Sequence, residues 1–129
     1  MAIFDPKDTI DYQHVWDATP ADLTIVKGDP AVKQDVFGFY LKDCEALAEE
    51  VCFIWKMRQV LAAKATGTGE AIISGDHLYY YPTLEYVRPT GVGTFGVDYY
   101  YCGTALRDAT ASETTVLMDF DGRRWDEDV

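Results

Sequence analysis

Short segments rich in Val, Ile, Tyr, Phe and Thr alternate along this chain with clusters of Gly, Pro and Asp. The clearest alternation spans 114–121, where Val116, Met118 and Phe120 lie on one side and mostly polar residues lie on the other. This period of two predicts a strand with one buried face. Many short strands separated by turn residues are typical of all-β proteins. The pattern therefore predicts a small β-barrel or β-sandwich of short antiparallel strands.

Four further segments also have strand-like patterns. Residues 33–43 place apolar side chains on both faces, which indicates a central strand covered on both sides. The run 96–106 is long, and Gly103 within it predicts a bulge or bend. The other two predicted strands are 22–26 and 76–81.

Residues 43–65 fit two kinds of structure. Apolar side chains at roughly helical spacing, together with Ala, Glu and Leu, favour a helix. The β-branched and aromatic run VCFIW and the alternation around it favour a strand. We expect a strand over 50–57 and a second strand over 59–63, with the helix as the alternative.

The first twenty residues have no clear period. They mix charges with isolated large apolar side chains, which predicts an extended arm that docks on the same domain or on a partner. An ordinary first strand with a frayed start is the alternative. The chain is thus divided into an N-terminal arm (1–20), a β-domain (21–122) and an acidic C-terminal tail (123–129). The candidate partner-binding residues of the arm are Phe4, Ile10, Tyr12, Val15 and Trp16.

Composition narrows the classes of function. The chain has 129 residues, 48% of them hydrophobic, and a net charge of −11. This length suits one compact domain. An acidic surface repels phosphate backbones and anionic lipids, no apolar run is long enough to span a membrane, and the N-terminus lacks the pattern of a secretion signal. We therefore expect neither nucleic acid nor a membrane as a partner.

Motifs for catalysis or ligand binding are incomplete. The segment KATGTGEA lacks the Lys-Ser/Thr pair of a phosphate-binding loop, and Glu70 would repel a phosphate. The segment DFDGRRWDEDV lacks the third ligand and the bidentate glutamate of an EF-hand. His14 and His77 are not accompanied by a nucleophile motif. We expect no enzymatic activity, no cofactor and no metal.

Three cysteines, Cys44, Cys52 and Cys102, form no Cys-x-x-Cys pair. Buried free thiols in a reducing compartment are the expected state. A single disulfide or a zinc site completed by the two histidines is the alternative.

Tyrosine occurs in two runs of three, at 79–81 and 99–101. Surfaces that stack nucleic-acid bases carry basic neighbours, whereas acidic residues flank both runs. In the first run, Leu78 and Tyr80 would share one face of a strand, with the remaining tyrosines on the other face. A role in the core or at a protein interface is expected, with sugar or ligand binding as the alternative.

Gly-Asp pairs precede two strand-like runs, in VKGDPAV and ISGDHLY. Glycine tolerates the positive φ that many turns require, and an aspartate can accept hydrogen bonds from backbone amides ahead of it. We therefore expect structural turns at Gly28 and Asp29 and at Gly75 and Asp76, in addition to the bend at Gly103.

Taken in order, these motifs resemble a family of small capsid decoration (cement) proteins of tailed bacteriophages, some of which carry a recombinase-like label. The shared order is an Ile-Asp-Tyr segment, a Gly-Asp turn, a Lys-Ala-x-Gly-like link, an Ala-Ile-x-x-Gly-Asp turn, an aromatic strand and a Thr-Val strand before a glycine. The resemblance covers about 10–122 and is best over 64–122. The chain departs from the family in AEE at 48–50, in the bulky FIWKMR segment and in the long RPTGVGTFGVD loop.

The resemblance implies a structural virion protein, made in the bacterial host cytoplasm, that binds the outer surface of the phage head. Its partner would be the major capsid protein, whose neighbouring subunits it would hold together. It also implies a homo-oligomer, first of all a trimer. The arm would share in capsid binding, so that deleting 1–18 would abolish binding and leave a folded barrel. The alternatives are another head–tail structural protein (tail tube, head completion or fibre base) and a carbohydrate- or small-ligand-binding β-module.

Overall fold

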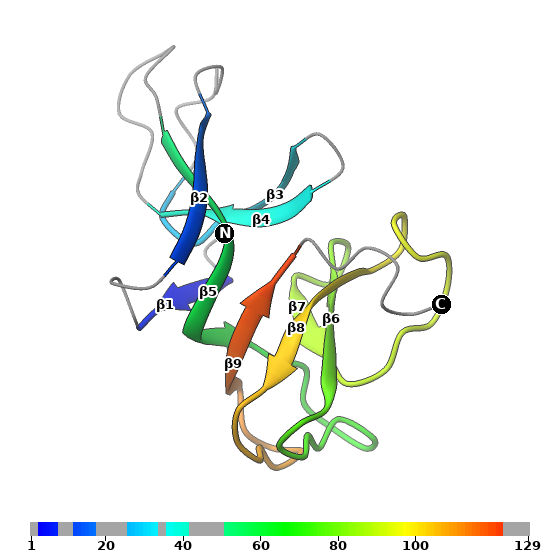
Figure 1. Cartoon of the computed structure of the whole chain (residues 1–129). Coiled ribbons are helices and arrows are strands. Elements are labelled where there is room, and N and C mark those ends of the chain that lie inside the picture. Colours follow the sequence, from blue (N-terminus) through cyan, green and yellow to red (C-terminus); the bar gives the residue numbers. More distant parts are fainter. Residues whose placement is uncertain (1–2, 8–11, 18–25, 34–35, 42–50, 123–129) are drawn as a thin grey trace.

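The computed structural model describes residues 3–7, 12–17, 26–33, 36–41 and 51–122. Within these residues there is no helix, and hence none that could cross a membrane. Their strands form one antiparallel sheet that curls into a half-barrel (Figure 1), so the predicted all-β class is confirmed. The strands are β1 (Phe4–Pro6), β2 (Tyr12–Asp17), β3 (Pro30–Lys33), β4 (Val36–Tyr40), β5 (Val51–Ala63), β6 (His77–Tyr81), β7 (Tyr86–Arg88), β8 (Tyr100–Ala105) and β9 (Thr115–Asp121).

The sheet runs in the order β3-β4-β5-β9-β8-β6-β7, and β1 and β2 also pair with β5. β9 therefore lies between β5 and β8, near the middle of the half-barrel. Its Val116, Met118 and Phe120 side chains are buried, as their alternation predicts. The predicted strand 22–26, apart from Val26, lies outside the described residues.

β5 is the strand around which the others are arranged. Its first half lies between β2 and β4, and its second half lies between β1 and β9. The two halves meet at a bulge, where the register shifts between Met57 and Val60 and Gln59 has a φ of 57°. A bulge bends a strand, which lets one strand serve both halves of the sheet. Strand structure is thus confirmed over 51–63 and the helix is excluded there, but the two strands predicted for 50–57 and 59–63 are one continuous strand with a bulge.

The main core is rich in aromatic rings from β1, β4, β6 and β9. The ring of Phe120 lies 5.0 Å from that of Phe4 and 4.9 Å from that of Phe39, between centroids. Phe37 stacks on Tyr80 at 5.4 Å. All five side chains are at most 4% exposed. Aromatic pairs at these distances add to the stabilisation from burial.

β4 is covered on both faces, as its sequence predicts. Phe37 and Phe39 point into the main core, whereas Tyr40 packs against Phe53 on the other face at 5.6 Å. Gly38 lies on the same face as Tyr40. A Cβ at Gly38 would lie 2.6 Å from the Phe53 ring, so the glycine leaves the room that this ring occupies.

β1 joins the β-domain. The backbone N–H groups of Ile3 and Phe4 both donate to the carbonyl oxygen of Gly28, at 3.1 and 3.2 Å. Ala63 N–H donates to the carbonyl oxygen of Ile3 at 3.0 Å. Phe4 is only 2% exposed. β1 therefore docks on its own domain, one of the two placements expected for the arm, and Phe4 is a core residue in this structure. Its expected role in binding a partner stays a prediction.

The other candidate residues of the arm are placed only in part. Tyr12, Val15 and Trp16 belong to β2, which pairs with β5 along its first half. Their side chains, and the whole of Ile10, lie outside what the structure describes. The pairing shows that 12–17 also belongs to the sheet at the level of the backbone.

The first Gly-Asp turn is closed twice by hydrogen bonds. Asp29 N–H donates to the carbonyl oxygen of Val26 at 3.0 Å, and Val26 N–H donates to Asp29 Oδ2 at 3.0 Å. Gly28 has a φ of 92°, a region that glycine adopts without strain. The turn leads directly into β3.

The second Gly-Asp turn repeats the first. Asp76 N–H donates to the carbonyl oxygen of Ile73 at 2.9 Å, and Ile73 N–H donates to Asp76 Oδ2 at 3.0 Å. Gly75 has a φ of 95°. In both turns the aspartate accepts from an amide three residues before it, whereas the sequence suggested amides ahead of it.

Gly103 lies at a register shift between β6 and β8. Leu78 pairs with Gly103 and Tyr79 pairs with Tyr101, so Cys102 is the extra residue on β8. The φ of Gly103 is 146°, and a Cβ there would collide with the carbonyl oxygen of Asp119. A bulge at this place therefore requires glycine.

Candidate binding surface

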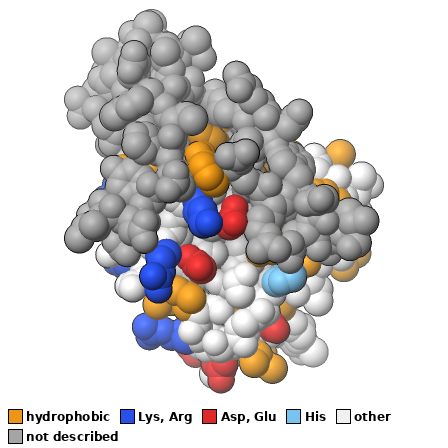
Figure 2. All heavy atoms as spheres, viewed as in Figure 1, with side chains coloured by type: hydrophobic (Ala, Val, Ile, Leu, Met, Phe, Trp, Pro, Cys, Tyr) orange, Lys and Arg blue, Asp and Glu red, His pale blue; other side chains and the backbone are white. Residues whose placement is uncertain are grey.

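Residues 89–98, which make up all but the last residue of the connection between β7 and β8, project from one side of the half-barrel (Figure 1). We call this segment the β7–β8 loop. Its Val92 and Val97 side chains are 68% and 67% exposed. No charged residue occurs from 89 to 97, although 26% of the chain is charged. Along the right-hand edge of Figure 2, the side on which Figure 1 shows this loop, the described atoms are mostly apolar or uncharged.

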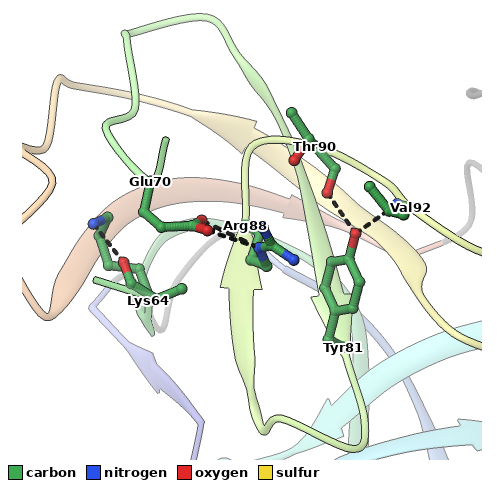
Figure 3. Close-up of polar contacts among 7 residues, drawn as sticks. Lys64, Glu70, Tyr81, Arg88, Thr90 and Val92 are labelled. Atoms are coloured by element: carbon green, nitrogen blue, oxygen red, sulfur yellow. Dashed lines mark hydrogen bonds and ion pairs between the residues drawn. The ribbon is translucent and has the colours of Figure 1, made fainter. Parts of the chain in front are cut away.

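The Tyr81 hydroxyl holds the first part of this loop (Figure 3). It donates to the carbonyl oxygen of Thr90 at 2.6 Å and accepts from the N–H of Val92 at 2.7 Å. The Tyr81 ring is 5% exposed and stacks on Tyr99 at 5.7 Å. A buried side chain on β6 thus fixes the backbone on both sides of residue 91.

Asp98 closes the second part of the loop. Its N–H donates to the carbonyl oxygen of Thr94 at 2.8 Å, and its Oδ2 accepts from Thr94 N–H at 2.8 Å. The two halves of the loop are close together, because a Cβ on Gly93 would lie 2.6 Å from Asp98 Oδ2. Val92 directly precedes Gly93 and Val97 directly precedes Asp98, so the two valines emerge from the same part of the loop.

Two tyrosines of β6, one of β8 and Tyr99, the residue just before β8, form a second buried cluster beneath the β7–β8 loop. Tyr79 and Tyr81 lie on the face of β6 opposite Leu78 and Tyr80, as expected. Tyr79 meets Tyr99 edge-on at 5.4 Å, and Phe95 from the loop also meets Tyr99 edge-on at 5.5 Å. The cluster is Tyr79, Tyr81, Tyr99 and Tyr101, none more than 7% exposed. These four rings therefore leave no open stacking platform for a sugar or a base.

A partly buried ion pair fixes the base of the β7–β8 loop. Arg88, the last residue of β7, places its Nη2 2.8 Å from Glu70 Oε2, and its Nε donates to both carboxylate oxygens. These hydrogen bonds raise the pKa of the Arg88 guanidinium, while desolvation opposes the shift. The guanidinium also lies 5.2 Å from the centre of the Tyr81 ring (Figure 3). The Arg88 side chain is thus held by the Glu70 carboxylate and by the Tyr81 ring.

Lys64 is a buried cation with a structural set of partners. Its ammonium donates to the carbonyl oxygens of Ala65, Thr110 and Glu113 at 2.7, 3.0 and 3.0 Å. Burial lowers the pKa of Lys64, and the charges of Glu70 and Glu113 oppose this shift. All three ammonium protons have acceptors, so the side chain ties two loops together and has no donor left for a ligand.

A groove of about 260 Å³ lies between β3 at one edge of the sheet and β6 and β8 near the other. Its floor is formed by Phe37, which stacks on Tyr80 and on Tyr100, both at 5.4 Å. The lining is apolar or aromatic and consists of Pro30, Ala31, Val32, Phe37, Tyr80, Pro82 and Tyr100.

Groups that could ligate a metal or attack a substrate are scattered. Among the described residues, no three His, Cys, Asp or Glu side chains gather as metal ligands would. Cys102 is a buried free thiol whose S–H donates to the carbonyl oxygen of Leu78 at 3.4 Å, and burial raises its pKa. His77 is exposed and meets the Tyr101 ring edge-on. The side chains of His14, Cys44 and Cys52 lie outside the described part.

Comparison with known proteins gives no match: no protein-family model, no curated protein and no solved structure is detectably similar to this chain. The sequence did not single out Val92 or Val97. The signal that could have found them is the uncharged, glycine-rich run PTGVGTFGV in a strongly acidic chain.

Proposed function

We propose that this chain is a structural virion protein that decorates the outer surface of a tailed-phage head. It binds the major capsid protein and stabilises contacts between neighbouring subunits. The observation that carries the proposal is the ordered series of motifs shared with the decoration family. Support comes from the two Gly-Asp turns of that series, which have the same pattern of hydrogen bonds although they lie 47 residues apart (Asp29 and Asp76).

The physical mechanism requires binding and no reaction. A capsid under internal DNA pressure fails where neighbouring subunits separate. A protein that bridges two subunits adds its own binding free energy to the work of separating them. An interface of standard size buries about 1,600 Å² in total and supports affinities from micromolar to picomolar. Repetition over the capsid lattice multiplies this gain.

The charge supports a location on the outside of the head. A protein with a net charge of −11 is repelled by packaged DNA, so the inner surface would be unfavourable. The same charge opposes non-specific association between copies in solution. Trimerisation around a local three-fold axis of the capsid remains our proposal for the bound state.

The test uses heads that lack this protein, prepared from a virus whose gene for it has been deleted. Purified protein is added in increasing amounts, and the copies bound per head are counted after sedimentation. We expect saturable binding with about one copy for each major capsid subunit, and heads that resist heating better once saturated. Heads that already carry the protein serve as the control and should take up none.

Two outcomes would contradict the proposal. Binding of only a few copies per particle would indicate a head-completion or tail component. No binding to the heads at any concentration would exclude a decoration role, and a glycan array would then test the alternative of a carbohydrate-binding module.

A further inference from the structure

We propose that the β7–β8 loop is the part of this protein that inserts into an apolar depression on the capsid subunit, with Val92 and Val97 as the inserted side chains. This inference rests on the proposed function and assigns the contact to residues outside the N-terminal arm. Three observations support it: the exposure of the two valines, the hydrogen bonds that fix the loop, and the lack of charged residues from 89 to 97.

The exposure of these valines has no structural benefit within the isolated chain. Val92 and Val97 are 68% and 67% exposed, whereas most large apolar side chains among the described residues are buried. Apolar side chains gathered on one exposed feature commonly mark an interaction site. Burying both valines against a partner would remove their apolar surface from water, which favours binding.

The loop is rigidly held in this exposed position. Tyr81 fixes its first part through two hydrogen bonds, and Asp98 fixes its second part through two more. The ion pair of Arg88 with Glu70 holds its base. A loop that is already ordered loses little conformational entropy on binding, so more of the contact energy appears as affinity.

The charge pattern selects the kind of partner. The loop is uncharged from 89 to 97, and the exposed Asp98 that follows uses its carboxylate to accept a hydrogen bond from Thr94 N–H. A second copy of the chain would bring its own net charge of −11 toward this acidic protein, and an anionic membrane would be repelled in the same way. A neutral or basic rim around an apolar depression is the complementary surface. A capsid subunit is the partner to which we commit.

Ile73 provides a matched comparison. It is 66% exposed, but it lies in the second Gly-Asp turn, away from the β7–β8 loop. The carboxylates of Asp76 and Asp108 accept hydrogen bonds from the amides of Ile73 and Ser74, so two acidic groups bond to the backbone at this site. It is therefore as exposed as the two valines, but two carboxylates bond to its turn, whereas only Asp98 bonds within the β7–β8 loop.

The test compares Val92→Asp and Val97→Asp with Ile73→Asp on the same deletion heads. A carboxylate placed in an apolar depression is desolvated without a partner. We expect each valine variant to bind about tenfold more weakly or worse, and Ile73→Asp to bind within about twofold of the original protein. Circular dichroism and thermal unfolding should show all three variants folded, because each site is exposed.

A second variant tests the role of loop rigidity. Tyr81→Phe keeps the stacked ring but removes the hydroxyl and both of its hydrogen bonds. We expect faster hydrogen exchange at the Val92 amide and binding weakened about threefold to tenfold, with Val92 and Val97 intact. Unchanged exchange and unchanged binding in this variant would contradict the proposed pre-organisation of the loop.

The outcomes separate the inference from the function on which it rests. If the original protein fails to bind the heads, both are overturned. If the original protein binds and all three aspartate variants bind equally well, the decoration role stands and the loop is not the contact. If the valine variants change only the oligomeric state in solution, the loop joins copies of this chain, and the inference is again overturned.

Discussion

At the scale of single residues, two glycines show that a positive φ and a lack of room for a Cβ are separate reasons why a position requires glycine. Gly103 and Gly67 both have positive φ, 146° and 114°. A Cβ at Gly103 would collide with the Asp119 carbonyl oxygen, whereas a Cβ at Gly67 would meet no heavy atom within 4 Å. Substitution at Gly67 therefore imposes backbone strain alone, and substitution at Gly103 also forces β8 away from β9.

We expect Gly103→Ala to lower the free energy of unfolding by about 3 kcal/mol or more, and Gly67→Ala to lower it by about 1 kcal/mol. Urea denaturation of the two variants and the original protein measures both values. Equal losses would show that the β8–β9 contact adapts to the extra methyl group.

For the Gly-Asp turns, the sequence predicted the positions of the turns but not the direction of their side-chain hydrogen bonds. Their positions were predicted because the two hydrogen bonds that close each turn form within four consecutive residues. The direction in which Asp29 and Asp76 bond was missed, because an aspartate can reach amides on either side of itself. The backbone geometry of the turn decides which of these amides the aspartate bonds.

At the scale of elements, β1 shows which of the placements expected for the N-terminal segment the fold adopts. Its three residues were assigned to an arm because no period organises the first twenty positions. In the structure, Phe4 packs against rings from β4, β6 and β9. A strand of three residues is too short for a period to show, so only its partners reveal it.

Phe4→Ala is therefore expected to destabilise the fold by about 3–5 kcal/mol, through lost burial and the cavity left behind. Val32→Ala, at a 40% exposed site on β3, is the control and should change stability by at most about 0.5 kcal/mol. Thermal and urea unfolding measure both variants. A loss at Phe4 no larger than that at Val32 would mean that the packing of β1 contributes little to the stability of the fold.

For β5, the sequence predicted where the strand pattern is interrupted, but not that the interruption is a bulge. The expected break between 57 and 59 coincides with the bulge at Gln59. Alternation ends wherever an extra residue enters a strand, so the position is visible in the pattern. A bulge and a turn interrupt the pattern in the same way, and only the continued pairing with β1 and β9 distinguishes them.

At the scale of the whole molecule, the half-barrel brings the aromatic side chains of distant strands into one core. Burial raises the pKa of Tyr80 to about 12, and the negative charges of Glu85 and Asp29 add to the shift. In the unfolded chain the phenol ionises near pH 10. Between these values the unfolded state has released a proton that the folded state retains, so stability falls as pH rises.

We therefore expect the free energy of unfolding to decrease from pH 10 to about 12, and to decrease less in Tyr80→Phe, which has no phenol to ionise. Below pH 10 the variant and the original protein should differ by a constant amount. Urea denaturation at several alkaline pH values tests this. Parallel curves across the whole range would show that Tyr80 ionises in the fold as it does in solution.

The amino-acid sequence alone determined the all-β class, most strands of the described part and the turn glycines, because these depend on side-chain alternation and on contacts among neighbouring residues. The tertiary structure decided which apolar residues are core and which are surface. Phe4 and Val92 are both isolated apolar side chains in irregular sequence, yet one is 2% and the other 68% exposed. That difference arises from strands far apart in the chain, which close over Phe4 and leave the β7–β8 loop outside.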